Sequence, residues 1–139
     1  MYHKIIIAGY LGRDPEMRYT QDGTPVTNFS VAASRKYNRP DGTKVDETIW
    51  FRVTAWRQLA ELCNEYLQKG RPVLIEGRLK PDENGNPRIW TGNDGQARAS
   101  FEVTATTVRF LGGRGDAGVG PGVPDEPPPP EPGESEIPF

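Results

Sequence analysis

The chain has 139 residues, with 17 Lys and Arg, 19 Asp and Glu, one His and one Cys. This length allows one domain and a tail, and a lone cysteine excludes an internal disulfide, as is typical of the cytosol. With one His and one Cys, the chain cannot form the usual zinc clusters, so we expect no cofactor and no metal. Without a long apolar run or a signal peptide, we expect a cytoplasmic protein that does not enter membranes.

The net charge of −2 is unevenly distributed. Residues 1–111 carry 16 Lys and Arg against 13 Asp and Glu, whereas residues 112–139 carry one Arg against six acidic residues. A mildly basic body with an acidic tail favours a polyanion as the partner of the body, although so small an excess is also compatible with chance.

Residues 3–11 are apolar on both alternating faces, which predicts a strand covered by the core on one side and by a second layer, such as another subunit, on the other. A turn at 12–15 and a short strand at 16–20 lead to a hairpin turn at 21–24. Residues 26–37 alternate with Phe29, Val31 and Ala33 inward. Parity then places Arg35 and Tyr37 on the same side, so the strand is expected to run past the core.

The tip that follows is strongly basic around Tyr37, with Arg35, Lys36 and Arg39. It is interpreted either as a solvated loop or as a basic finger that stacks on a flat ligand, and both interpretations stay open at this point.

Residues 44–56 return as the strand that carries the strongest functional signal. Ile49, Phe51, Val53 and Ala55 give one face the composition of a core. Trp50, Arg52, Thr54 and Trp56 alternate with them on the other face. Two tryptophans around an arginine indicate a second buried face, a protein contact, or a platform that stacks unpaired nucleobases and holds a phosphate on Arg52.

The spacing of apolar residues predicts one helix over 57–69, with a buried stripe of Leu59, Leu62, Cys63, Tyr66 and Leu67. Gly70 and Pro72 mark its end, and Cys63 is interpreted as a packing residue. A strand over 73–80 is interrupted by Gly77, a candidate bend.

A polar hairpin around 88–91 places Trp90 among cations, with Arg88 beside it. This is the second place where an aromatic residue lies among cations outside the obvious core. The closing strand, 99–111, has Phe101, Val103 and Ala105 inward, and a change of phase near residues 106–107 predicts a bulge.

Residues 112–133 are rich in Gly and Pro and predict a disordered linker. The acidic tip, residues 134–139, ends in Ile137, Pro138 and Phe139. These apolar residues are either an accident of the terminus or a peptide that docks Phe139 and its carboxylate in a basic pocket of another protein.

Five short, mostly antiparallel strands with one helix between the third and the fourth predict an all-β OB-fold, a Greek-key barrel over residues 1–111. In this fold, strands 2–3 and the 1–2 and 4–5 loops bind oligonucleotides, and the candidate residues fall on those elements. The expected phosphate contacts are Arg35, Lys36, Arg39, Arg52, Arg78 and Arg88.

The sequence also resembles the bacterial single-stranded DNA-binding proteins over essentially its whole length. The resemblance is carried by Gly9 to Tyr19, Trp50 to Val53, Leu59 to Glu61, Tyr66 to Gly70, Val73 to Leu79 and the terminal Ile137-Pro138-Phe139. Together these motifs are highly specific, although none is so alone. Base stacking is the known mechanism of this family, so the resemblance and the stacking hypothesis do not count as two independent lines of evidence.

The resemblance implies base stacking on Tyr37, Trp50, Trp56 and Trp90, with Tyr37 standing where the family usually has Trp and Trp56 where it usually has Phe. It implies a homotetramer that pairs through the first strand, residues 3–11, and a location at the nucleoid. It also implies that Glu136, Ile137, Pro138 and Phe139 recruit replication, recombination and repair proteins. The tip is less acidic than the family's usual run of aspartates, which puts the strength of that binding in question.

We therefore expect sequence-independent, non-catalytic binding of single-stranded DNA. An RNA-binding OB module of the cold-shock type is the alternative, against which the Ile-Pro-Phe tail argues. A small hydrolase or nuclease is a third reading, but the sequence lacks paired carboxylates at metal-binding spacing and a glycine loop before a helix.

Overall fold

The computed structural model describes residues 1–112, so most of the predicted linker and the whole acidic tip lie outside the described residues. The elements in chain order are β1 (Ile5–Leu11), β2 (Glu16–Tyr19), β3 (Pro25–Asn38), β4 (Lys44–Trp56), α1 (Gln58–Tyr66), β5 (Pro72–Leu79), β6 (Ile89–Thr91), β7 (Ala97–Ala99) and β8 (Phe101–Phe110). Among these residues, no helix is long and apolar enough to span a bilayer.

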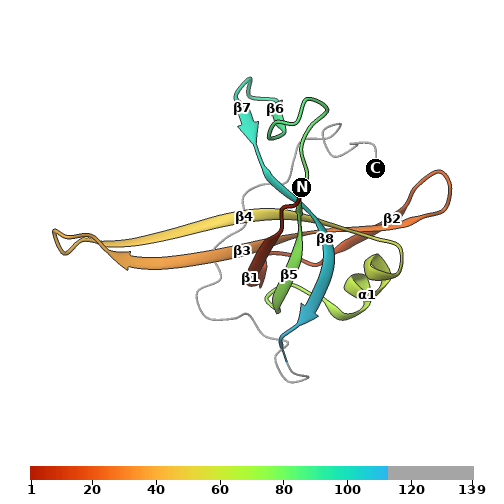
Figure 1. The fold of residues 1–139 in the computed structure, drawn as a ribbon, viewed down its shortest axis with the longest axis horizontal. Coiled ribbons are helices and arrows are strands. Elements are labelled where there is room, and N and C mark those ends of the chain that lie inside the picture. Colours follow the sequence, from red (N-terminus) through yellow and green to blue (C-terminus); the bar gives the residue numbers. More distant parts are fainter. Residues whose placement is uncertain (113–139) are drawn as a thin grey trace.

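Five strands close into a barrel in the order β1-β5-β8-β4-β3, because β1 pairs with both β5 and β3 (Figure 1). All pairs are antiparallel except β4–β8, which is parallel and brings the last strand against the third barrel strand. The short strand β2 pairs with β3 outside this ring, and β6 and β7 form a separate hairpin. The predicted five-stranded barrel with one helix before the fourth strand is confirmed.

Alternating residues of the barrel strands fill the core, which includes Phe29, Val31, Val53, Ile75 and Val103. The helix adds Ala60 and Cys63 to the same cluster, and Leu67, just after its end, joins them. Two residues expected inside lie instead at the mouth of the barrel. Phe101 is 58% exposed and Ile49 is 36% exposed, because they lie level with and beyond Phe51, the last buried residue of β4 toward the end where the β3–β4 hairpin leaves the barrel (Figure 1).

The helix α1 is shorter than predicted and ends at Tyr66, which is 49% exposed rather than buried. The chain becomes extended at Leu67. The backbone amides that follow donate hydrogen bonds to β1 and to the turn after it, and so do not continue the helix. The amide of Lys69 donates to the side chain of Asp14 at 2.8 Å, and the amide of Gly70 donates to the carbonyl of Leu11 at 2.9 Å. Helix propensity could not reveal these long-range contacts.

The predicted irregularity in the last strand is confirmed as a β-bulge. Glu76 pairs with Thr107 and Gly77 with Ala105, so Thr106 is the extra residue on β8. Gly77 is required at this point, since a Cβ there would lie 2.2 Å from the carbonyl oxygen of Thr104.

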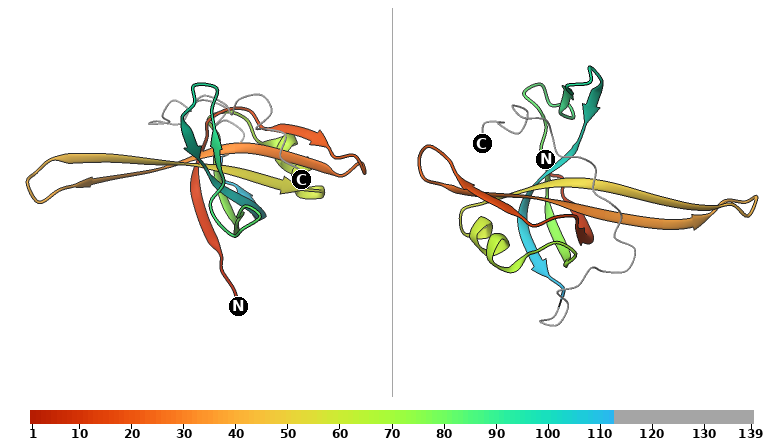
Figure 2. Two further views of the ribbon diagram at one scale, coloured as in Figure 1. Left: turned by 90° about the horizontal axis from the view of Figure 1, so that it is seen from above. Right: turned by 180° about the vertical axis from the view of Figure 1, so that it is seen from behind.

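The hairpin of β3 and β4 extends far beyond the barrel, as the views along two axes show (Figures 1 and 2). The two strands stay paired from Val26–Trp56 near the helix to Asn38–Lys44 at the tip. The expectation that the chain runs past the core before the turn is therefore confirmed.

One strained residue joins β4 to α1. Arg57 has φ of 59° and is the sole non-glycine residue with positive φ among residues 1–112. Its amide donates to the carbonyl of Pro25 at 2.9 Å, and its carbonyl accepts from Glu61 at 3.2 Å. These two bonds hold the chain in a conformation that costs a side-chain-bearing residue about 1–3 kcal/mol.

The substitution Arg57→Gly is expected to stabilise the protein by about 1 kcal/mol, because glycine adopts positive φ without steric strain and this gain exceeds its entropic cost. The free energy of unfolding, measured by urea titration, checks this. The control Arg57→Ala retains the strain and should give no gain. Equal stability of the glycine and alanine variants would contradict the assignment of strain to Arg57.

Candidate nucleic-acid interface

The outer face of β4 carries Trp50, Arg52 and Trp56, all only partly buried. Their register partners on β3 are small or short side chains, since Trp50 lies opposite Ala32 and Arg52 opposite Ser30. The two indoles are six residues apart, which corresponds to about 20 Å along a strand. Each indole can therefore stack on a different base, with Arg52 between them.

Arg52 lies in a mixed electrostatic environment. Burial lowers the pKa of its guanidinium, Glu102 on β8 opposes this shift, and smaller contributions come from Arg88, Arg18 and Glu16. The Nη1 atom of Arg52 is closed off from solvent and has no hydrogen-bond partner among the described residues. The side chain of Arg52 is thus only partly exposed on this face, with one of its guanidinium nitrogens buried beneath the surface.

The β6–β7 hairpin supplies a second aromatic site next to this face. The guanidinium carbon of Arg88 lies 5.0 Å from the centroid of the Trp90 ring, a cation–π arrangement. Across the hairpin, Trp90 pairs in register with Arg98, which forms an ion pair with Asp94 at 2.9 Å. The charge of Arg88, just before β6, also contributes to the lowered pKa of Arg52, so these two guanidiniums lie close enough to interact.

Two further predicted cations lie on the same face as Trp50. Lys36 is opposite Asp46 near the tip of the long hairpin, so an acidic neighbour offsets part of its charge. Arg78 on β5 lies in register with Thr104, which is itself in register with Thr54 of β4. Arg39 follows β3 in the exposed turn at the tip.

Tyr37 and Arg35 do not share this face. The register places them opposite Val45 and Glu47 on the side of the hairpin that continues the core. Arg35 lies over the ring of Tyr37 at 4.7 Å from its centroid. The predicted site residues thus form two groups on opposite faces of the β3–β4 hairpin.

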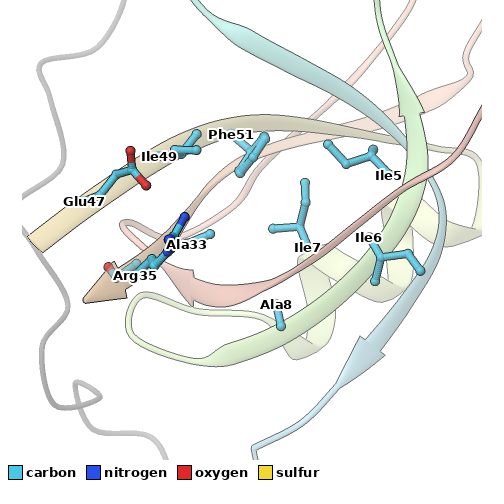
Figure 3. Close-up of a pocket in the computed structure, with 10 residues that line it drawn as sticks. Ile5, Ile6, Ile7, Ala8, Ala33, Arg35, Glu47, Ile49 and Phe51 are labelled. Atoms are coloured by element: carbon cyan, nitrogen blue, oxygen red, sulfur yellow. The ribbon is translucent and has the colours of Figure 1, made fainter. Parts of the chain in front are cut away.

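The face that carries Arg35 also borders an apolar recess of about 320 Å³ between β1 and the β3–β4 hairpin (Figure 3). Ile5 and Ile7 line it from β1, and Ile49 and Phe51 line it from β4. Arg35 and Glu47 lie at its outer end, toward the tip of the hairpin (Figure 3). The recess is a separate surface from the outer face of β4 that carries Trp50, Arg52 and Trp56, here called the tryptophan face.

Two residues of the site were not identified from the sequence. Arg18 of β2 pairs in register with Val26 of β3, which in turn pairs with Trp56 of β4. Glu102 of β8 lies directly opposite Arg52. The alternation of each strand points these side chains outward, but only the pairing of distant strands brings them to Arg52.

Cys63 is buried in the core, and burial raises the pKa of its thiol to about 12. The thiol is therefore neutral at physiological pH, as expected for a packing residue. Within residues 1–112, no cluster of His, Cys, Asp and Glu has the arrangement of a metal site.

Comparison with known proteins assigns this architecture to a family. Residues 2–111 match the model of the single-strand binding protein family. The chain belongs to this family. A single-stranded DNA-binding protein of Neisseria meningitidis is 41% identical over 114 residues, which cover 82% of this chain and 62% of that protein. Single-stranded DNA-binding protein 1 of Chlorobaculum tepidum is 38% identical over 117 residues, covering 84% and 68% respectively.

Solved structures of the family share the fold. The small single-stranded DNA-binding protein from Streptomyces coelicolor superimposes with a TM-score of 0.64 at 29% identity, covering 78% of this chain and 93% of that one. A deletion mutant of the Thermus aquaticus single-stranded DNA-binding protein gives a TM-score of 0.62 at 25% identity, covering 81% and 52%. The chain spans about 62% of the length of the Neisseria relative.

Proposed function

We propose that this chain binds single-stranded DNA without sequence specificity and without catalysis. The observation that carries the proposal is the partly exposed outer face of β4, on which Arg52 lies between Trp50 and Trp56. Indole rings stack on any unpaired base, and the surrounding arginines attract phosphates. Membership of the single-strand binding protein family supports the same conclusion.

Stacking explains why single strands are preferred to duplexes. The π-faces of bases are available only when the bases are unpaired and unstacked from their neighbours. Trp90 with Arg88 extends the path beyond β4, and Tyr37 with Arg35 extends it to the opposite face of the hairpin. A flexible single strand can follow such a path, whereas a stiff duplex cannot.

Substitution of Trp50, Trp56 or Trp90 by alanine is expected to weaken binding of oligo-dT by about 1–3 kcal/mol per lost stacking contact, a range known from this class of protein. Quenching of tryptophan fluorescence by oligo-dT, duplex DNA and single-stranded RNA measures the affinities. Quenching by the single DNA strand that weakens as salt rises is the expected result.

The matched control is Tyr66→Ala, which removes an exposed aromatic residue of α1 that contacts Phe110, away from the tryptophan face. It should leave affinity unchanged. Equal binding of duplex, or tighter binding of RNA, would refute the proposed ligand, and cleavage of DNA with magnesium would refute the non-catalytic role.

The protein self-associates as a homotetramer through β1 in this proposal. Ile6 of β1 is 62% exposed, and Ala8 beside it is exposed as well, whereas Ile7 between them is buried in the core. Such an outward apolar row on a barrel strand is suited to burial against another copy. The adjoining apolar recess enlarges the surface available to it (Figure 3).

Introducing a charge by Ile6→Glu should dissociate the assembly to smaller species, because a carboxylate in an apolar interface loses its hydration. Sedimentation velocity of the full chain measures the oligomeric state. Leu111→Glu, which charges an exposed apolar residue just after β8, is the control and should leave the assembly intact. An Ile6→Glu tetramer would show that β1 is not the interface.

The C-terminal tip recruits other proteins in this proposal, so that the protein protects unwound DNA and serves replication, recombination and repair in the cytoplasm, at the nucleoid. Support comes from the sequence of the tip, where Ile137, Pro138 and Phe139 follow the acidic Glu134 and Glu136. A terminal phenylalanine with its carboxylate fits an apolar pocket with a basic rim.

Deletion of residues 136–139 is expected to leave the affinity for oligo-dT nearly unchanged, since the stacking residues are retained, and to abolish capture of replication and repair proteins. Fluorescence titration and pull-down from a bacterial lysate measure the two properties. Loss of DNA binding on deletion would contradict the separation of the two roles.

A further inference from the structure

A neutral polar pair lies on the tryptophan face, between its two indoles. The hydroxyl of Thr54 on β4 donates to the side-chain oxygen of Asn28 on β3 at 2.9 Å. The two residues are opposite each other in the register of the strands, and the next pair on the same face is Val26 with Trp56. The amide of Asn28 therefore lies in the floor of the face, one residue pair away from an indole.

The hydrogen bond from Thr54 fixes the orientation of the Asn28 amide. Thr54 is only 6% exposed, so its hydroxyl needs a partner within the protein, and the oxygen of Asn28 supplies it. The NH2 group is the other branch of that amide and takes no part in this bond. Asn28 itself is partly exposed, and its nitrogen is not among the enclosed, unpartnered atoms found in residues 1–112. The NH2 group is therefore left to donate to a ligand on this face.

The charge beside Asn28 favours a neutral ligand. Glu16 of β2 is exposed and pairs in register with Asn28 on the side away from β4. The Cβ atoms of such a pair lie about 5 Å apart, so a phosphate held by Asn28 would also lie beside a carboxylate. A base edge carries no net charge and avoids this repulsion. The carbonyl oxygen of a base accepts hydrogen bonds, which makes it a fitting ligand for a group that only donates.

We propose that Asn28 is a base-binding residue of the single-strand site, whose NH2 group donates to a carbonyl oxygen of a base stacked on Trp56 while Thr54 holds the amide in place. Successive residues on one face of a strand are about 7 Å apart, so a base on this indole can extend its edge to Asn28. Carbonyl oxygens occur on thymine, cytosine and guanine, so the contact adds affinity without reading a sequence. The inference rests on the proposed single-stranded DNA binding and adds a hydrogen bond to its stacking contacts.

The first test crosses a change in the protein with a change in the DNA. The full chain and its Asn28→Ala variant are titrated with oligo-dT and with an oligonucleotide of equal length in which difluorotoluene replaces thymine. This ring has the shape of thymine and can stack, but it lacks the carbonyl oxygens. Asn28→Ala should weaken binding of oligo-dT by about fivefold for each subunit engaged and leave binding of the analogue unchanged. An equal loss with both oligonucleotides, as a phosphate contact would give, or no loss with either, would overturn the inference.

The matched control is Asn64→Ala, which removes the same side-chain amide from an exposed position of α1 and should change neither affinity. Asn28→Asp is the second variant, in case Asn28→Ala does not fold, because a carboxylate still accepts from Thr54 but cannot donate. It should weaken binding of oligo-dT about fivefold more than binding of the analogue, and equal weakening of both would contradict the base contact. Absence of any single-strand binding by the unmodified chain would instead refute the proposed function itself.

Discussion

Closure of the barrel is the constraint on which the rest of the structure depends. The first strand must pair with β5 along most of its length and also reach β3 at Tyr10 and Leu11. This crossing needs close contact between backbones. A Cβ at Gly9 would lie 2.1 Å from the carbonyl oxygen of Ala32, so only glycine allows β1 to approach β3 there. Gly77 is required for the same reason where β5 pairs with β8, since a Cβ there would collide with the backbone of β8.

Once the ring is closed, the size of the core is limited. Alternate residues of five strands and one stripe of α1 fill it. The tryptophans of β4 are on the outward parity and have no place inside, so they remain at the surface. The aromatic face of β4 thus follows from the same alternation that builds the core, and it lies on a strand rather than on a loop.

The electrostatics of the face also follow from the pairing of strands. Parallel pairing of β4 with β8 sets Glu102 beside Arg52, and the β6–β7 hairpin brings Arg88 near the same point. Cations and carboxylates are interleaved there. The face therefore combines aromatic rings with charges of both signs, and the pairing of distant strands sets this arrangement.

The sequence by itself determined the alternation of the strands, the inward apolar residues, the bulge near Thr106 and the overhang of Arg35 and Tyr37. These properties are local, because the alternation of a strand and the residue types of a turn can be recognised from neighbouring residues. Only the tertiary structure decided that α1 stops at Tyr66, that Phe101 lies at an open mouth, and that Tyr37 and Trp50 occupy opposite faces. It also decided that Glu102 lies in register with Arg52, because register between strands some fifty residues apart depends on how the whole barrel closes.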